Sequence, residues 1–305
     1  MEKFAKIFFL ALCMVAMAGC IRDKIEPCPP LTVTLEVTDK NWFNIDEVAA
    51  EGLAEPMDEN LPFREFVQSL SYELIDVETG DPVASGVYDV THDGQTETLS
   101  FDGALPFGQY ELVVWGNVSS IPGKSSLSTD GVMLHEDGKW GADNVYHYAG
   151  ILDYNYDSAF YSAGLERTVG CLLVEATELP SGMDFSIKDV DGVHGTVGKG
   201  FVYDVPESVH TELDWGADAT SVKTETCLGP TPDGDDASLT IKFRDMDLYV
   251  EGETGWPYEI ASDPVDITME RNRMTVIKYN YEADGFHIMI LVNGQWEQMH
   301  QMGID

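Results

Sequence analysis

The stretch Leu31-Thr32-Val33-Thr34-Leu35-Glu36-Val37-Thr38 alternates apolar and polar residues without a fault. Successive side chains of an extended strand point to opposite faces, so its four apolar residues share one face and its four polar residues the other. This period of two is typical of a strand that is buried on one side only. The stretch therefore predicts that the chain folds around β-sheet.

Similar runs follow, separated by turn residues. In a later run Tyr110, Leu112 and Val114 share one face, while Val113 and Trp115 share the other. A strand that is apolar on both faces is typical of the centre of a sandwich. These further strands are predicted at residues 71–77, 83–90, 96–101, 108–117 and 165–176.

Three segments lack a strand period. Residues 44–65 carry seven carboxylates, one arginine and two prolines, which predicts an acidic loop with one helical turn. Residues 118–144 are rich in Ser, Gly and Asp and predict a long loop with a short hairpin. Residues 153–164 change composition and show no period, so we expect a domain boundary at residues 162–163.

The last part of the chain predicts a meander of antiparallel strands. Alternating residues run over 275–281 and 286–292, and the pairs Asp284-Gly285 and Asn293-Gly294 follow the two runs. Such pairs supply the positive φ angles that two-residue hairpins require. Upstream, the apolar parity changes between residues 243 and 246, which predicts a bulge or sharp bend. The residues of the two parities are Leu239, Ile241 and Phe243, and then Met246, Leu248 and Val250.

The fold class follows from these patterns. Strong amphipathic helical periods are absent, and no repeat of 20–50 residues is visible. Short strands at this spacing predict an all-β protein of two sandwiches in tandem. We expect a signal peptide at residues 1–19, a spacer at residues 20–30, a first domain at residues 31–162 and a second at residues 163–305.

The first twenty residues predict export and a lipid anchor. Two lysines precede an apolar run of roughly a dozen residues, too short for a spanning helix but suited to a cleaved signal peptide. The run closes with Met17-Ala18-Gly19-Cys20, which predicts cleavage between Gly19 and Cys20. Acylation of Cys20 would then tether the chain to a bilayer by lipid alone. An ordinary secretory signal with a chance cysteine is the alternative.

Charge limits the partners of the protein. Lys and Arg together number 17 and Asp and Glu 54, which gives a net charge of −37. A surface this acidic repels phosphate, so nucleic acid and anionic lipid head groups are excluded as partners of the protein body. The charge keeps the protein soluble near other anionic surfaces, but it does not identify a ligand.

Three of the five cysteines remain once Cys13 leaves with the signal and Cys20 carries lipid. In an oxidising setting the three cannot all pair internally. Cys28 with Cys227 is one option for a disulfide, while Cys171 lies in an apolar run and is expected to be a buried thiol. Their spacing matches no zinc pattern.

Catalytic motifs are absent from the sequence. There is no Gly-x-Ser-x-Gly, phosphate loop or dinucleotide fingerprint, so we expect a protein that is not an enzyme and holds no cofactor or metal. Two acidic turns at residues 189–192 and 233–236 resemble fragments of calcium loops but do not complete them. A hydrolase with paired carboxylates is the weakest alternative. Lone histidines are expected to be solvated: His92, His135, His147, His194, His210, His287 and His300.

Tryptophans leave open a role in binding sugars. Trp115 is expected in the core, whereas Trp140, Trp215 and Trp256 lie near Gly and Pro turns and could form a stacking platform. A glycan-binding surface lipoprotein is therefore an alternative function.

Several stretches together resemble the FimB-like family of fimbrillin-associated anchor lipoproteins. They are Cys20 with the spacer that ends in Cys28-Pro29, the strand Tyr110-Glu111-Leu112-Val113-Val114-Trp115-Gly116-Asn117, the pair Leu165-x-Arg167, and the closing Val292-Asn293-Gly294-Gln295-Trp296. The resemblance spans most of the chain. It implies two transthyretin-like (Greek-key) sandwich domains, lipid-anchored in the outer membrane at the cell surface, that hold the base of a type V fimbria.

The resemblance also implies strand addition, in which a segment of a neighbouring pilin fills an apolar groove at an unpaired sheet edge. Shaft subunits of such fimbriae lose their lipid and first strand when a trypsin-like protease cuts after an arginine. Arg64 follows the 31–38 strand in the acidic loop, and cutting there would release that strand. A shaft or tip subunit is therefore the alternative to an anchor. The implied partners are pilin subunits and, through acylated Cys20, outer-membrane lipid.

Overall fold

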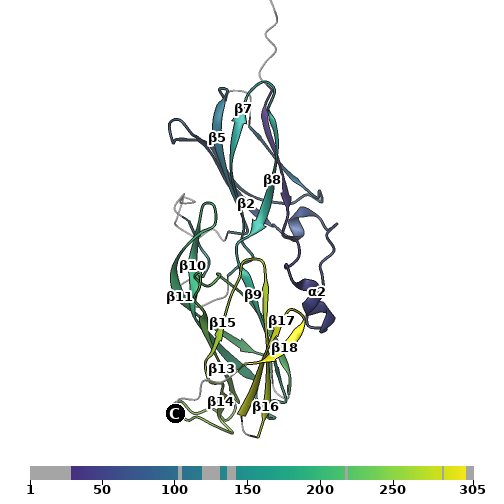
Figure 1. Ribbon diagram of the computed structural model, residues 1–305, viewed down its shortest axis with the longest axis vertical. Coiled ribbons are helices and arrows are strands. Elements are labelled where there is room, and N and C mark those ends of the chain that lie inside the picture. Colours follow the sequence, from purple (N-terminus) through teal and green to yellow (C-terminus); the bar gives the residue numbers. More distant parts are fainter. Residues whose placement is uncertain are drawn as a thin grey trace, which may run out of the picture.

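The computed structural model describes residues 29–101, 105–118, 131–135, 142–216, 219–283 and 285–299. Two β-sandwiches lie end to end in an elongated molecule (Figure 1). This confirms the prediction of an all-β protein built from sandwiches. No helix within the described ranges is long and apolar enough to cross a membrane.

The first sandwich contains one hydrogen-bonded path of strands in the order β3-β2-β5-β7-β8-β1-β4. β7 and β8 pair at two positions, Tyr146 with Arg167 and His147 with Glu166, and the path folds there into two layers. The apolar faces of both layers meet in one core. The strands are β1 (Leu31–Val37), β2 (Ser69–Asp76), β3 (Pro82–Asp89), β4 (Glu97–Phe101), β5 (Gly108–Gly116), β7 (Tyr146–Tyr154) and β8 (Phe160–Arg167).

The second sandwich packs two sheets around a separate core. One sheet has the order β12-β9-β16-β17-β18, from β9 (Gly170–Thr177), β12 (Val222–Leu228), β16 (Met274–Glu282), β17 (Gly285–Val292) and β18 (Gln295–Gln298). The other has the order β11-β10-β13-β14, with β15 beside β13. Its strands are β10 (Phe185–Gly198), β11 (Val202–Asp214), β13 (Ala237–Arg244), β14 (Glu259–Ala261) and β15 (Val265–Ile267).

The antiparallel meander at the C-terminus is confirmed, and so is its second expected turn, while Asp284 of the first expected turn lies outside the described residues. β16 pairs with β17, and β17 pairs with β18, both antiparallel. Asn293 and Gly294 have φ angles of 49° and 70° at the second turn. The bend expected after Phe243 is also present, because β13 ends at Arg244 and a turn follows.

Two expectations need correction. Met246, Leu248 and Val250 form no inward face, because their side chains are 47%, 48% and 53% exposed. The boundary expected at residues 162–163 falls inside β8, which pairs with β1 in the first sandwich, while β9 pairs with β12 and β16 in the second. The chain therefore changes sandwich between Arg167 and Gly170, and the aperiodic residues expected to mark the boundary contain the turn between β7 and β8.

Two parts of the first half of the chain pack on the second sandwich. We call residues 38–62, which join β1 to the short helix η1 (Phe63–Glu65), the crossing segment. It contains α2 (Ile45–Ala50), which lies beside β17 and β18 in Figure 1. β6 (Val132–Met133), from the expected long loop, pairs with β10, and most of the segment expected to hold a short hairpin lies outside the described residues.

Candidate functional site

The position of β1 inside its sheet is the feature that bears most directly on function. β1 pairs parallel with β8 on one side and antiparallel with β4 on the other. Within the described residues β4 has no other strand partner. At the two ends of β1, Thr32 donates its amide proton to the carbonyl of Ala159 at 2.8 Å, and Thr38 donates to Leu165 at 3.0 Å. Loss of β1 would therefore open β8 and detach β4.

Burial holds β1 firmly in this position. Leu31, Val33 and Leu35 are fully buried and Val37 is 4% exposed, as the alternation predicts. Each such side chain contributes about 1.5–3 kcal/mol when fully buried, so the four together contribute roughly 6–12 kcal/mol as an upper estimate. A strand-accepting groove at this position would therefore already be filled by the chain itself.

The crossing segment is fastened to the second sandwich by hydrogen bonds. The amide of Phe43 donates to the carbonyl of Asn272 at 2.8 Å. Asn44 and Met274 exchange two bonds of 2.9 Å each, from side chain to backbone in both directions. Lys223 on β12 donates its ammonium proton to the carbonyl of Leu53 at 2.6 Å.

Apolar contacts add to these bonds. Ile45, Val48 and Leu53 of the crossing segment are 8%, 0% and 5% exposed. They pack on the outer face of the β9–β16 sheet, where Leu173 and Val276 are fully buried. This face would otherwise be an exposed apolar patch. The stretch that follows β1 is thus a structural cover of the second sandwich and not a free loop.

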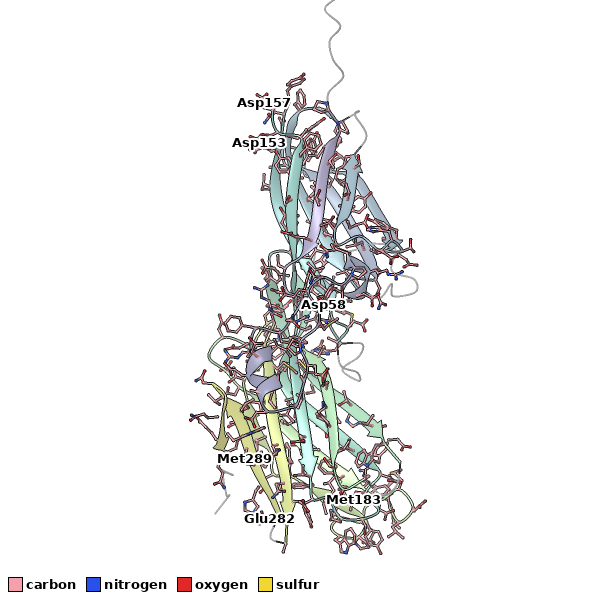
Figure 2. All side chains as sticks on the ribbon, turned by 90° about the vertical axis from the view of Figure 1, so that its right-hand side faces the viewer. Asp58, Asp153, Asp157, Met183, Glu282 and Met289 are labelled. Carbon is pink, nitrogen blue, oxygen red and sulfur yellow. The ribbon has the colours of Figure 1, made fainter. Side chains whose placement is uncertain are left out.

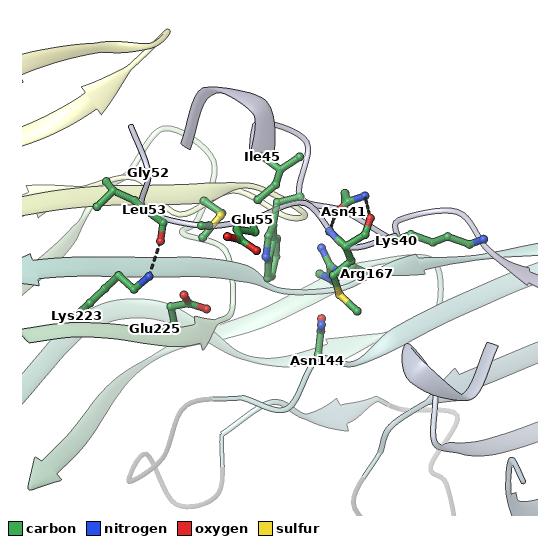
Figure 3. A pocket seen from close by; sticks show the side chains of 14 residues that line it. Lys40, Asn41, Ile45, Gly52, Leu53, Glu55, Asn144, Arg167, Lys223 and Glu225 are labelled. Atoms are coloured by element: carbon green, nitrogen blue, oxygen red, sulfur yellow. Dashed lines mark hydrogen bonds between the residues drawn. The ribbon is translucent and has the colours of Figure 1, made fainter. Parts of the chain in front are cut away.

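Arg167 joins the two sandwiches at their junction. It lines a pocket of about 410 Å³ between the crossing segment and the sheet ends (Figure 3). The side chain is 2% exposed, and its guanidinium lies 3.8 Å from the centre of the Trp42 ring. It donates to the amide oxygen of Asn272 at 2.7 Å and to the Tyr146 hydroxyl at 2.9 Å, while its backbone amide donates to Asp39 at 2.9 Å. The Arg167 side chain therefore links three segments, which contribute Trp42, Tyr146 and Asn272.

His147 makes a second junction contact. Its Nδ1–H donates to the carbonyl of Val114 at 3.0 Å, and its Nε2 accepts the amide proton of Gly200, in the turn between β10 and β11, at 3.0 Å. The ring is fully buried and stacks on Trp115 at 3.8 Å. Burial lowers the pKa of His147 from 6.5 to about 4, although the Val114 carbonyl and the Glu166 carboxylate favour the charged form. The neutral ring therefore holds the turn of the second sandwich against the first.

The expectation of solvated histidines is wrong for His147 and for His135, both of which are fully buried. The burial of His147 could not be predicted from the sequence. Residues 146–154, which form β7, carry no regular alternation and were not predicted as a strand. The role of Arg167 also could not be derived from spacing, because its partners come from distant parts of the sequence.

Arg64 lies in η1, where its side chain is 42% exposed. Its guanidinium lies 2.8 Å from the Asp93 carboxylate. The bond after it is part of a closed turn, because the amide of Glu65 donates to Pro62 at 3.0 Å. Phe63 and Phe66 beside it are 1% and 5% exposed. The arginine is reachable from solvent, but the backbone around it is folded and pinned by buried neighbours.

The candidate sugar-stacking tryptophans differ in environment. Trp256 is 55% exposed in the loop between β13 and β14. Trp215 is half-buried and makes a T-shaped contact with Phe243 at a centroid distance of 6.1 Å. Trp140 lies outside the described residues, as do Gly19, Cys20 and Cys28. Trp115 is 3% exposed, as predicted for the core.

Acidic side chains are spread over the whole molecule. Figure 2 shows Asp153 and Asp157 at the far end of the first sandwich, Asp58 near the junction and Glu282 at the far end of the second. In the described ranges no group of three or more His, Cys, Asp or Glu side chains could hold a metal ion. The acidic side chains of the described residues are therefore distributed over both sandwiches.

Comparison with known proteins supports the fold. No protein-family model matches the chain, and a search among curated proteins finds no match. A candidate adhesin from Bacteroides ovatus superposes with a TM-score of 0.56 at 14% identity, covering 93% of this chain and 98% of that one. A candidate polysaccharide-binding protein from Bacteroides thetaiotaomicron gives 0.56 at 11% identity, covering 89% and 98%. The fimbrial anchor protein Mfa2 from Porphyromonas gingivalis gives 0.49 at 14%, covering 89% and 100%. The first two structures show a shared two-sandwich fold. The TM-score of the third is too low to support the comparison.

Proposed function

We propose that this chain is a lipid-anchored protein of the cell surface that holds the base of a fimbria and docks a neighbouring pilin by strand addition. The observation that carries the proposal is that β1 is built into the first sandwich while its continuation covers the second. A chain with this arrangement is suited to keep its N-terminal link. The solved structure of the candidate adhesin, which has the same fold, is in line with a surface role.

The proposed anchor is acylated Cys20 in the outer membrane. Leu31 opens β1 shortly after it, and the carbonyl of Pro29 accepts a bond from the Tyr154 hydroxyl at 2.7 Å. Tyr154 ends β7 at the end of the first sandwich away from the junction, where Figure 2 labels Asp153. A lipid at Cys20 would therefore leave the second sandwich pointing away from the membrane. The several acyl chains of a lipoprotein give stable attachment.

Retention of β1 distinguishes an anchor from a shaft or tip subunit. Cleavage at Arg64 would leave β1 paired with β8 and β4, and α2 would remain bound through Asn44 and Leu53. Release of β1 and the crossing segment would expose buried apolar side chains in both sandwiches, in addition to breaking the pairing of β1 with its neighbouring strands. We therefore favour the anchor over a subunit that sheds its first strand.

Strand addition in this proposal takes place at an open sheet edge, because the groove between β8 and β4 holds β1. β3 and β4 end the path of the first sandwich, and such ends present backbone groups for pairing with another chain. An extended pilin segment would gain strength from backbone hydrogen bonds and register from alternate side chains.

The decisive experiment identifies the N-terminus of the surface form. Mass spectrometry of protein released from intact cells should find an acylated Cys20, and an Arg64→Gln variant should have the same size and abundance as the native chain. An Arg22→Gln variant serves as a matched control for loss of an arginine outside the described fold. A surface form that begins at Glu65 would overturn the anchor assignment.

Glycan binding is a second candidate, favoured by the exposure of Trp256. The polysaccharide-binding description of one solved structure of the same fold is in line with it. Affinity electrophoresis in gels that contain polysaccharide should show retardation that a Trp256→Ala variant loses. Equal mobility of both proteins in every gel would eliminate this candidate.

A further inference from the structure

Cys171 and Cys227 face one another at the edge of the five-stranded sheet. β9 and β12 pair antiparallel with these two residues opposite each other. The amide of Cys171 donates to the carbonyl of Arg273 on the other side of β9 at 2.9 Å. The carbonyl of Cys227 accepts the amide proton of Ala142 at 2.7 Å, again away from the partner strand. The two residues therefore form a non-hydrogen-bonded pair of the ladder.

That position has the geometry of a disulfide. The Cα atoms of non-hydrogen-bonded pairs lie about 4.5 Å apart, within the range of about 4.4–6.8 Å that disulfides span. Leu172 and Leu228 next to the cysteines point into the interior core, so alternation places both thiols together on the outer face. Both are free thiols in this structure. We propose that Cys171 and Cys227 are an oxidation site at which a cross-strand disulfide fastens β12 to β9.

The reaction joins the two sulfur atoms and removes one proton and one electron from each thiol. The two electrons and two protons pass to the disulfide of a protein thiol oxidase, which becomes a dithiol, or to that of an oxidised small thiol, which becomes two free thiol molecules. Burial raises the pKa of the Cys171 thiol, and it raises that of Cys227 to about 11 against the opposing charge of Arg167. Because the thiolate is the reacting form, oxidation belongs to the folding chain, before β12 closes on the sheet.

This pairing competes with the option of Cys28 and Cys227. Pro29 is held beside Tyr154 at one end of β1. At the other end, Asp39 bonds the backbone of Arg167, whose charge acts on Cys227. The seven residues of β1 between these ends span roughly 23 Å. Pro29, which directly follows Cys28 in sequence, thus lies at the opposite end of β1 from Arg167, and this separation favours Cys171 as the partner of Cys227.

The disulfide would stabilise β12 near the junction of the two sandwiches. β12 is an edge strand with β9 as its neighbour, and it carries Lys223, which holds the crossing segment. Cys227 itself borders the junction cluster that contains Val113 and Trp115 of the first sandwich. A covalent tie between β12 and β9 would resist exchange at this edge. The pairing does not depend on the lipid anchor or on a fimbrial role.

The test uses the chain from residue 20 to 305 with Cys20→Ser and Cys28→Ser, so that Cys171 and Cys227 are its two cysteines. The protein is unfolded, refolded in a glutathione redox buffer, and alkylated with a maleimide in denaturant. We expect a monomer that is lighter by two hydrogen atoms, takes up no maleimide, and takes up two after reduction. A non-reducing digest should contain one peptide pair linked through these residues.

A further change of Cys227→Ser provides the control, which should take up one maleimide. A β-folded monomer that still reacts at both thiols overturns the proposal, as does loss of thiols only to glutathione adducts or to dimers. The same refolding with Cys28 restored gives a second outcome. A dominant Cys28–Cys227 peptide would overturn the assignment, and retention of the Cys171–Cys227 peptide would support it.

Discussion

Acidification is expected to weaken the contact between the two sandwiches through His147. The ring accepts the amide proton of Gly200 at 3.0 Å through Nε2, and a protonated ring would place a second N–H against that donor. Around it lie Trp115, the Glu166 carboxylate and the turn that carries Lys199, whose ammonium is paired with Glu111 at 2.8 Å. Because the ring is fully buried, the Gly200 amide would lose its acceptor at a position where an unpaired polar group costs free energy.

The magnitude follows from the pKa of the buried ring. In the unfolded chain the histidine titrates near 6.5, whereas burial lowers the pKa to about 4 in the folded protein. Between these values the unfolded state binds more protons, so the free energy of unfolding falls as the pH falls. The contribution of His147 is complete above pH 6.5. It decreases by about 2.5 kcal/mol at pH 4.5 and by about 3 kcal/mol below pH 4.

The assay is urea unfolding at pH 7.5 and pH 4.5, followed by tryptophan fluorescence, for the native protein and for His147→Gln. The amide side chain can accept from Gly200 and donate to Val114 but does not titrate. The variant should be less stable at pH 7.5, by about 1 kcal/mol for the lost stacking on Trp115. It should also lose about 2.5 kcal/mol less than the native protein on acidification, because the shared carboxylates cancel in the difference.

The matched control is His194→Gln. His194 also stacks on an aromatic ring, Tyr203 at 5.5 Å, and also bonds a backbone carbonyl, but it is not fully buried. Its variant measures at pH 7.5 the cost of losing a stacked imidazole that is not fully buried. The reasoning about His147 is refuted if the native protein and His147→Gln lose the same free energy of unfolding.

Three further predictions concern stability at neutral pH. Leu35→Ala in the middle of β1 should lower the free energy of unfolding by about 2–5 kcal/mol, while Glu36→Ala, which points to solvent, should change it by less than about 0.5 kcal/mol in the same denaturant titration. Arg167→Lys keeps the charge but loses the planar stacking on Trp42 and one directed hydrogen bond. We therefore expect the free energy of unfolding to fall by about 2 kcal/mol, measured by calorimetry or urea unfolding. An unchanged unfolding midpoint would contradict the role of Arg167 at the junction. Trp256→Ala should leave the melting temperature unchanged, whereas Trp115→Ala should cost about 3–5 kcal/mol; a large effect at Trp256 would mean that it is structural and not a surface contact.

Local patterns predicted the parts of the fold that local physics decides. The alternation over residues 31–38 corresponds to β1 with its apolar face buried, and Asn293-Gly294 occupies positive φ angles between β17 and β18. In both cases the sequence pattern that predicts the feature lies within a few residues, although β1 pairs with strands far away in the chain. The absence of helical periodicity likewise was sufficient to predict the all-β class.

Features that depend on distant partners were not predictable in this way. Residues 44–65 were expected to form an acidic loop, yet Val48 is fully buried because α2 meets an apolar face formed by β9 and β16. The opposite error occurred at Leu248, which alternates like a core residue but lies exposed in a turn after β13. Hydrophobic periodicity indicates which face of a segment can be buried. Whether that face is buried depends on a segment from another part of the chain.

The continuity of β1 with the crossing segment favours an anchor on energetic grounds. A strand intended for release should end in a linker with few contacts, so that one cut frees it. In this protein the linker contributes Ile45, Val48 and Leu53 to a second core and bonds Met274 and Lys223. Removal would therefore uncover apolar surface on both sandwiches at once, at a cost comparable to the marginal stability of a whole domain. These contacts would oppose the release of β1. They would also hold the folded protein firmly to an anchor at its N-terminal end.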